Sequence, residues 1–450
     1  MASLNPQVKR VFVSALALTR STEYAARSLG VAPFLPALFV DRFTHLGGIA
    51  PSVFSVQLDA CRSFDDERWA AHWEAFATEH LAIADIALSS LGAPAVRDLL
   101  DAADADRTHR LGELLAPAVE ILADRGAVAA PDAVGEFSAR KPEARDAAIA
   151  LDALIKAMVY EFAAAWPGWT SRRLRAYETS HRLCEVVLTA LAPAMGLTVE
   201  TVRIPCGGND HVRGYLIAPE GARQLPTVLI TNGLEGSLAE TTLPLLKYRT
   251  EDMAYFVMEM PGTYNYRRPL TPQSERVYSA VIDFLAADRR ADAERIGMLG
   301  VSFGAYWATR MAAVEPRLRV AIANGAPADR SLAPTGALGV PEIIVSTIQR
   351  TVGADGLLDM IGKIKQLSLR DHLSRIGIPL LVLNGADDTL VRVEDSIDIA
   401  TYAPDAKLVL YADDDHCAMK NAEAWFDLAV RFLRDELGAT VTASHTGQFR

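Results

Sequence analysis

One short motif constrains this chain more than any other stretch. The segment Arg295-Ile-Gly-Met-Leu-Gly300-Val-Ser302-Phe-Gly304-Ala-Tyr-Trp places an apolar run before a G-x-S-x-G pentapeptide and a helix-forming run after it. This order is typical of a nucleophile elbow, in which a serine sits on a strained turn between a strand and a helix. We therefore predict that the Oγ of Ser302 projects from a sheet, and that the N–H of Phe303 faces the place where an oxyanion would form.

A serine hydroxyl needs a base to act as a nucleophile near neutral pH, and the base needs an acid to orient it. Asp387 and Asp388 follow the apolar run Leu380–Asn384, and His416 follows the last predicted strand. This is the order in which an acid and a histidine follow such an elbow. We choose Asp388 as the acid, with Asp387 as the alternative, and His416 as the base. The acidic residues at 413–415 are expected to be mostly solvated turn residues.

An oxyanion hole needs a second donor, which usually comes from the loop after the third strand. That loop is Thr231-Asn232-Gly233-Leu234-Glu235-Gly236-Ser237. The N–H of Leu234 is our choice and that of Glu235 the alternative. A carboxylate beside an oxyanion must be protonated or turned away. The Glu235 side chain therefore binds a cationic or hydroxyl group of a substrate, donates a proton after burial raises its pKa, or caps the next helix.

Four further residues are candidate substrate contacts. Tyr264, Tyr266 and Arg267 follow the fourth predicted strand and would border the same mouth. Trp307 lies on the helix after the elbow, where packing in the core is the competing role.

Two regions differ in composition, with the change near residue 195. Residues 1–195 show apolar residues at helical spacing, as in the amphipathic stretch Trp69–Leu81, so we predict an all-helical domain. Within it, Leu29–Phe54 is rich in proline and glycine and is predicted to be looser. Residues 196–438 are predicted to form the second domain, with a partly helical insertion at 326–375 near the site, and residues 439–450 a disordered tail.

Short β-forming runs alternate with helical runs after residue 196. The predicted strands are Thr198–Ile204, Val212–Ala218, Thr227–Thr231, Tyr255–Met260, Ile296–Leu299, Val320–Ala323, Pro379–Leu383 and Lys407–Tyr411. Most of the later ones are nearly all apolar, as parallel strands covered on both faces are. The fold class is therefore α/β, a mostly parallel doubly wound sheet with an antiparallel start.

Charge and cysteine usage exclude several other classes. A net charge of -11 argues against binding to nucleic acid or anionic membranes, and no apolar run is long enough to span a bilayer. The four cysteines, which include Cys417 beside His416, are scattered, so we expect free thiols in a cytoplasmic protein. The apolar run Val11–Leu18 lacks a cleavage end and predicts an amphipathic first helix. No motif for a metal or a cofactor is found, and none is expected.

These motifs resemble those of the α/β-hydrolase superfamily over roughly Thr198–Leu437. The Asn-Gly-Leu-Glu-Gly loop, the Met-Pro-Gly-Thr segment and the helical first half resemble a narrower group. This group holds 2,6-dihydropseudooxynicotine hydrolase and fungal pigment polyketide-shortening hydrolases, with fermentation/respiration-switch-like esterases more distant. The resemblance implies a Ser302–Asp388–His416 triad and hydrolysis of a carbon–carbon bond next to a ketone. It also implies a helical domain that walls the substrate cavity and takes part in a homodimer.

Three functions follow from these observations. The first is a serine hydrolase that acts on a bulky, apolar or aromatic small molecule, such as a polyketide-like ketone or an ester. The second is an acyltransferase or cyclase of secondary metabolism, which forms the same acyl-serine but excludes water. The third is a non-catalytic protein on a hydrolase fold, against which the intact Ser, Asp, His order counts.

Overall fold

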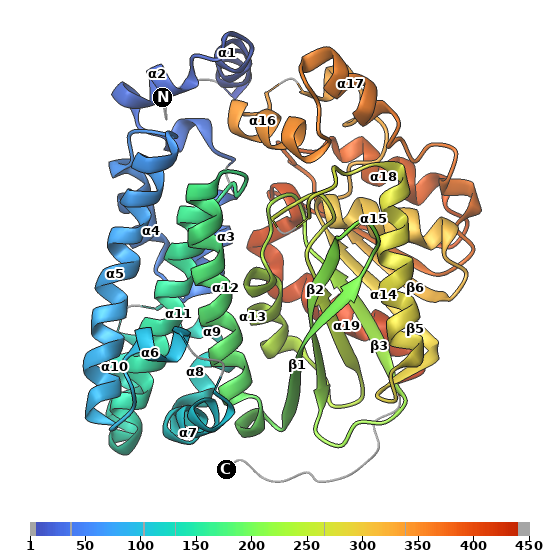
Figure 1. Cartoon of the computed structure of the whole chain (residues 1–450). Coiled ribbons are helices and arrows are strands. Elements are labelled where there is room, and N and C mark those ends of the chain that lie inside the picture. Colours follow the sequence, from blue (N-terminus) through green and yellow to red (C-terminus); the bar gives the residue numbers. More distant parts are fainter. Residues whose placement is uncertain are drawn as a thin grey trace.

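The computed structural model of the protein describes residues 6–36, 38–101, 104–130, 132–264, 266–337 and 339–439. Helices fill the first part of the chain, and a single sheet with helices on both faces fills the second (Figure 1). The tail predicted to be disordered, residues 439–450, lies outside the described residues except for Ala439. Within the described ranges, no helix is both long and apolar enough to cross a membrane.

The part of the chain before residue 195, called the helical half below, contains α1–α12. Their bounds are α1 (Pro6–Thr19), α2 (Thr22–Leu29), α3 (Phe39–Gly47), α4 (Pro51–Ala60), α5 (Asp66–Ser90), α6 (Val96–Asp101), α7 (Ala105–Leu115), α8 (Val119–Ala123), α9 (Arg125–Val128), α10 (Ala133–Arg140), α11 (Arg145–Ala165) and α12 (Ser171–Leu191). The predicted amphipathic stretch Trp69–Leu81 lies in α5, which packs along α11. Helix α5 begins where Asp65 accepts a hydrogen bond from the Arg68 N–H, as an N-cap does.

The segment Leu29–Phe54 is more regular than the sequence predicted. It contains α3 and the start of α4, and the glycines and prolines that indicated a loop mark helix ends instead. Gly48 follows α3 in the left-handed conformation at φ 63°, and Pro51 begins α4, where a missing N–H costs little. The Phe43 and Phe54 rings are fully buried and stack at 5.5 Å, so apolar burial orders the segment.

The sheet has eight strands in the order β1-β2-β4-β3-β5-β6-β7-β8. They are β1 (Leu197–Pro205), β2 (His211–Pro219), β3 (Leu225–Thr231), β4 (Ala254–Met258), β5 (Ala291–Val301), β6 (Leu318–Asn324), β7 (Leu380–Gly385) and β8 (Ala406–Tyr411). Strand β2 is antiparallel to both of its neighbours, and the pairs from β4 to β8 are parallel. The prediction of a mostly parallel sheet with an antiparallel start is confirmed.

Helices cover both faces of the sheet, so the strands are apolar on both sides. The helices in this part of the chain are α13 (Leu238–Tyr248), α14 (Glu275–Ala287), α15 (Phe303–Val314), α16 (Glu342–Thr351), α17 (Leu357–Lys365), α18 (Val393–Tyr402) and α19 (Ala422–Glu436), of which α16 and α17 lie over one end of the sheet. Along β3, Val228 and Ile230 belong to a core shared with α13, α19 and the helical half. Leu229, which points the other way, belongs to a second core with α14 and α15.

The segment 326–375 contains α16 and α17, in agreement with the predicted helical content of that stretch. Both helices lie at the same end of the molecule as α1 (Figure 1). The Gly339 N–H donates to the Ser14 Oγ at 2.8 Å, and the Thr22 N–H donates to the Glu342 carboxylate at 3.2 Å. The first helices and this late segment therefore meet over one end of the sheet.

Candidate active site

Ser302 occupies the strained turn that the pentapeptide predicted. It lies between β5 and α15 with φ 57° and ψ -124°, outside the regions that L-residues favour. A Cβ on Gly300 would lie 2.1 Å from the Gly304 carbonyl oxygen, and a Cβ on Gly304 would lie 2.4 Å from the Asn232 carbonyl oxygen. Both glycines of the motif are therefore required for the backbone to pass. The Ser302 N–H donates to the Asn324 carbonyl at 2.7 Å, which fixes the turn to β6.

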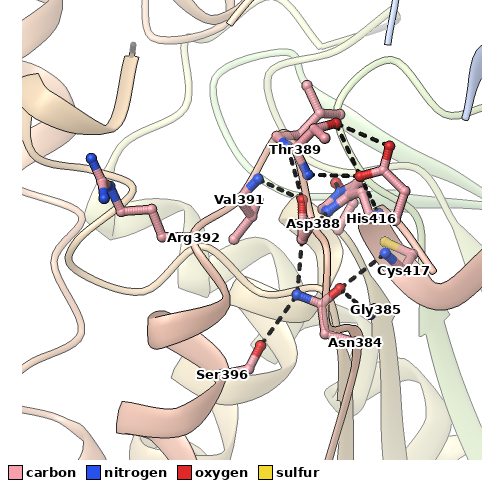
Figure 2. Close-up of polar contacts among 12 residues, drawn as sticks. Asn384, Gly385, Asp388, Thr389, Val391, Arg392, Ser396, His416 and Cys417 are labelled. Atoms are coloured by element: carbon pink, nitrogen blue, oxygen red, sulfur yellow. Dashed lines mark hydrogen bonds and ion pairs between the residues drawn. The ribbon is translucent and has the colours of Figure 1, made fainter. Parts of the chain in front are cut away.

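The structure brings Ser302, His416 and Asp388 together. The Nε2 of His416 lies 2.7 Å from the Ser302 Oγ. Its Nδ1 lies 2.8 Å from the Asp388 Oδ2, and both of these residues are labelled in Figure 2. The side chains of His416 and Asp388 are 4% and 0% exposed, so water does not compete for the bond between them. Asp387, the alternative acid, is exposed, and its N–H donates to the Asp414 carbonyl.

Four donors converge on the Asp388 carboxylate. Its Oδ1 accepts from the Leu390 and Val391 N–H groups, each at 2.8 Å, and its Oδ2 accepts from the Asn384 amide at 2.8 Å as well as from His416. Burial alone would raise the pKa of Asp388, but the charge of His416 and these hydrogen bonds lower it below its ordinary value. The carboxyl is thus held ionised.

Asn384 is a site residue that the sequence reasoning missed. It is fully buried at the end of β7, and its Oδ1 accepts from the Cys417 N–H at 3.1 Å while its amide donates to Asp388 (Figure 2). One side chain therefore ties the acid's loop to the residue after His416. The sequence could have indicated Asn384 by its position, near the end of β7 and four residues before Asp388.

The prediction that residues 413–415 are solvated is wrong for Asp414. Asp414 is 2% exposed, and its carboxylate accepts from the Asn421 N–H at 3.1 Å and the Asn421 amide at 2.7 Å. Asp415 accepts from the N–H groups of Thr389 and His416, at 2.7 and 2.8 Å. These carboxylates hold the loop around His416, because they accept from backbone N–H groups on both sides of it.

The charge of Asp388 also sets the protonation of His416. Burial alone would lower the pKa of His416, but the carboxylate at 2.8 Å opposes this and the pKa lies above its ordinary value of 6.5. The ionised carboxylate therefore favours the protonated form of the His416 imidazole.

The loop 232–237, called the oxyanion loop below, passes directly against Ser302. A Cβ on Gly233 would lie 2.6 Å from the Ser302 Cβ and 3.0 Å from its Oγ, so only glycine fits there. Among the described residues, the N–H groups of Leu234 and Phe303 have no backbone or side-chain acceptor. Two free N–H groups beside a serine are the arrangement that an oxyanion hole requires.

Glu235 does not cap the next helix, which was one of its predicted roles. Ser237 caps α13 instead, because its side chain accepts from the Glu240 N–H at 3.3 Å. The Glu235 side chain is buried, and its Oε2 accepts from the Gly168 N–H at 2.8 Å. Burial raises the pKa of Glu235 to about 7, although the Gly168 N–H and nearby arginines oppose the rise.

A cavity of about 900 Å³ lies over the serine. Its wall includes Ser302, His416, Leu234, Phe303 and Glu235, and side chains from α1, α3, α13, α16, α17 and α19 complete it. Most of these side chains are apolar. Ligand cavities span about 300–1,000 Å³, so this one is at the large end of the range. The contribution of α1 and α3 to the wall was not predicted residue by residue.

Two of the four predicted substrate contacts, Tyr264 and Tyr266, lie outside this wall because their hydroxyls are used in the fold. The Tyr264 hydroxyl donates to the Glu235 carbonyl at 2.6 Å, and its ring stacks on Tyr177 at 4.1 Å. The Tyr266 hydroxyl donates to the Glu259 carbonyl at 3.2 Å.

Arg267 and Trp307 are also outside the wall. The Arg267 N–H donates to Asp210 at 2.9 Å, which turns this residue toward the β1–β2 connection. The Trp307 ring is fully buried and packs at 5.2 Å from Tyr278, so its role is the core packing named as the alternative.

Known proteins resemble this chain in about half of its sequence and in its fold. It is 27% identical to 2,6-dihydropseudooxynicotine hydrolase of Paenarthrobacter nicotinovorans over 212 residues, 45% of this chain and 55% of that protein. It is 25% identical to Esterase FrsA of Vibrio parahaemolyticus over 253 residues, 53% of this chain and 60% of that protein. The chain therefore spans between half and two-thirds of the length of these curated relatives.

Solved structures show the same fold at lower identity. A crystal structure of 2,6-dihydroxy-pseudo-oxynicotine hydrolase, 21% identical, covers 90% of this chain and 99% of its own with a TM-score of 0.61. A structure of AbyA5, 22% identical, covers 72% and 94% with a TM-score of 0.56. The predicted α/β-hydrolase fold with a helical first half is thus confirmed. The model of the FrsA-like esterase family matches residues 135–437, more than half of the chain, and the chain belongs to that family.

Proposed function

We propose that this protein is a serine hydrolase with Ser302 as nucleophile, His416 as base and Asp388 as the orienting acid. One observation carries the proposal. A continuous chain of hydrogen bonds, 2.7 Å from Ser302 to His416 and 2.8 Å from His416 to Asp388, ends in the wall of a large cavity. Buried chains of this kind are arranged to move a proton off a hydroxyl.

The reaction proceeds in two stages, acylation and deacylation, and each stage takes one proton onto the same imidazole and one proton off it. The Oγ of Ser302 attacks the substrate carbonyl while its proton passes to the Nε2 of His416, and the N–H groups of Phe303 and Leu234 hold the oxyanion. The tetrahedral intermediate then collapses, and His416 returns the proton to the leaving group. Water, deprotonated by His416, then attacks the acyl-serine, and His416 returns this proton to the Ser302 Oγ as the bond to the acyl group breaks and the acid leaves.

The substrate class is a bulky, apolar or aromatic carbonyl compound. The volume of about 900 Å³ and the mostly apolar wall support this choice. A relative named for hydrolysis of 2,6-dihydropseudooxynicotine and relatives named as esterases support two bond types, a carbon–carbon bond next to a ketone and an ester. For the carbon–carbon bond, the proton from His416 goes to the departing enolate.

We also propose residues 1–195 as a cap domain and residues 196–438 as the catalytic domain, with residues 326–375 as an insertion. Side chains of α1, α3, α16 and α17 in the cavity wall support these roles. The homodimer and the cytoplasmic location expected from the sequence stay predictions.

The alternative is an acyltransferase or cyclase that uses the same acyl-serine. His416 is only 3% exposed beneath the helices that meet over the end of the sheet. This burial favours the acyltransferase or cyclase, because a dry site slows hydrolysis of the acyl-enzyme. Adding an acceptor alcohol or amine to an acyl donor separates the two functions. An acyltransferase forms the acceptor product, whereas a hydrolase releases the acid at an unchanged rate.

A fluorophosphonate probe followed by peptide mass mapping tests the central assignment. We expect one adduct, on Ser302, lost in Ser302→Ala and weakened in His416→Ala. Ser346→Ala is the matched control, because Ser346 also lies in the cavity wall and should leave labelling unchanged. A folded protein that never labels would overturn the hydrolase proposal.

A further inference from the structure

One residue of the oxyanion loop, Glu235, is held mainly from the helical half. Three donors converge on Glu235. Its carbonyl oxygen accepts from the Arg42 Nη2 at 2.9 Å and from the Tyr264 hydroxyl at 2.6 Å, and its carboxylate accepts from the Gly168 N–H at 2.8 Å. Arg42 lies on α3, and Gly168 follows α11. Two of the three donors therefore belong to elements before the sheet begins.

Arg42 bridges this loop and the helix that follows it. Its Nε and Nη2 donate to the Glu240 carboxylate at 2.5 and 2.8 Å, while Nη2 also donates to the Glu235 carbonyl. Glu240 lies in the first turn of α13. The guanidinium lies 5.5 Å from the Phe162 ring and 5.9 Å from the Trp166 ring, and the side chain is 12% exposed. A planar fork enclosed in this way has little freedom to move.

The loop needs such support because its backbone is strained. Glu235 has φ 55°, a conformation that costs a non-glycine residue on the order of 1 kcal/mol or more and persists only where the surroundings enforce it. The N–H assigned to the oxyanion hole belongs to Leu234, one residue earlier. If residue 235 relaxes, this N–H rotates away from the position that the oxyanion occupies.

We infer that Arg42 is a positioning residue for the oxyanion hole: it fixes the Leu234 N–H by holding the Glu235 carbonyl and Glu240 together. This inference rests on the proposed function. Stabilisation of the transition state then depends on the position of α3 against the oxyanion loop, although Arg42 itself contacts neither the triad nor the oxyanion.

Arg42→Lys tests the inference, because a lone ammonium cannot reproduce the two-nitrogen contact of Nε and Nη2 with Glu240 while it also donates to the Glu235 carbonyl. We expect kcat for p-nitrophenyl butyrate to fall at least about tenfold, up to the ~10²–10³-fold seen when one oxyanion donor is lost. KM should stay within about threefold, because the donor acts on the transition state. The acidic limb of the pH profile should not move, since His416 and Asp388 are untouched.

Arg172→Lys is the matched control. Arg172 lies in the helical half and donates to both oxygens of Glu74, but it has no contact with the oxyanion loop. Its kcat should equal that of the wild type. Glu240→Gln serves if Arg42→Lys does not fold, because it loosens Arg42 without removing it and should lower kcat in the same direction.

The outcomes separate the two proposals. A wild-type protein without a Ser302 adduct and without esterase activity would refute the proposed function. An active wild type whose Arg42→Lys form, or Glu240→Gln form if only that folds, keeps its full kcat would overturn this inference alone. A rise in KM with constant kcat would also overturn it, since Arg42 would then act on substrate binding.

Discussion

Replacing Asp388 by asparagine should remove most of the activity, because the acid's surroundings contain only donors. Its Oδ1 accepts from the Leu390 and Val391 N–H groups, and its Oδ2 accepts from Asn384 and His416. In Asp388→Asn, one of these two positions becomes an NH2 group and must face two donors.

The energies decide which way the new amide turns. Facing the Leu390 and Val391 N–H groups would leave two buried backbone donors unpaired, at about 1–3 kcal/mol each. Facing His416 and Asn384 costs less. The imidazole can move its proton to Nε2 and accept at Nδ1, and the Asn384 amide, which loses its acceptor on residue 388, still lies 3.4 Å from the Ser396 Oγ. The histidine then points a proton at Ser302 and no longer acts as a base.

We therefore expect kcat to fall by about 10⁴, the effect of the wrong tautomer in a serine triad, which corresponds to about 5 kcal/mol. Stability should fall by only about 1–3 kcal/mol, the cost of the one unpaired group. Ester hydrolysis and thermal unfolding measure the two effects separately. Asp387→Asn is the matched control, because that side chain is exposed and should change kcat less than about twofold.

Two results would refute this reasoning. An Asp388→Asn variant with more than about a tenth of the wild-type kcat would show that the tautomer does not switch. A loss of activity in Asp387→Asn with Asp388→Asn unaffected would assign the acid to the other residue.

Two further predictions concern the same site. Gly233→Ala should slow fluorophosphonate labelling by about 10²-fold or more, because its Cβ would lie 2.6 Å from the Ser302 Cβ. Normal labelling of Gly233→Ala would contradict the tight fit. The control is Gly135→Ala, an exposed change on α10 whose Cβ would meet nothing within 4 Å, and it should gain about 0.5–1 kcal/mol of stability. The base must be neutral, so kcat/KM should drop as pH falls through the raised pKa of His416, above 6.5. In Asp388→Asn the residual activity should persist to lower pH, because burial lowers the pKa of His416 once the carboxylate is gone. If the acidic side of the pH profile does not move, the titration belongs to another group.

The sheet and the strained turn at Ser302 could be predicted because their signals are local. Each strand is a short apolar run, and the elbow needs Gly300 and Gly304 within a few residues of Ser302, so the pattern is visible in the sequence. The choice between Asp387 and Asp388 was not local. It depends on which carboxylate the β7–α18 turn aims at His416, and the structure decides this through the Leu390 and Val391 N–H groups.

The residues that the sequence reasoning missed are those fixed by distant contacts. Arg42 meets Glu240 across 198 residues, and no periodicity links them. Tyr264 and Trp307 were named as candidate substrate contacts from their places after the fourth strand and after the elbow, with core packing as the competing role of Trp307, and neither lies in the cavity wall. Their direction depends on what packs behind them, Tyr177 in one case and Tyr278 in the other.

The cavity wall contains residues from two stretches of sequence, one inside and one outside the range that matches the family model. Ser302, Asp388 and His416 lie within residues 135–437, which match the family, whereas Ser14, Leu18, Phe39 and other wall residues precede that stretch. We therefore predict that replacing α1–α3 changes which molecules enter the cavity and leaves the proposed Ser302, Asp388 and His416 machinery in place. Family members with equal triads should then sort into substrate groups according to their first helices, and exchanging those helices between relatives is a direct route to altered selectivity.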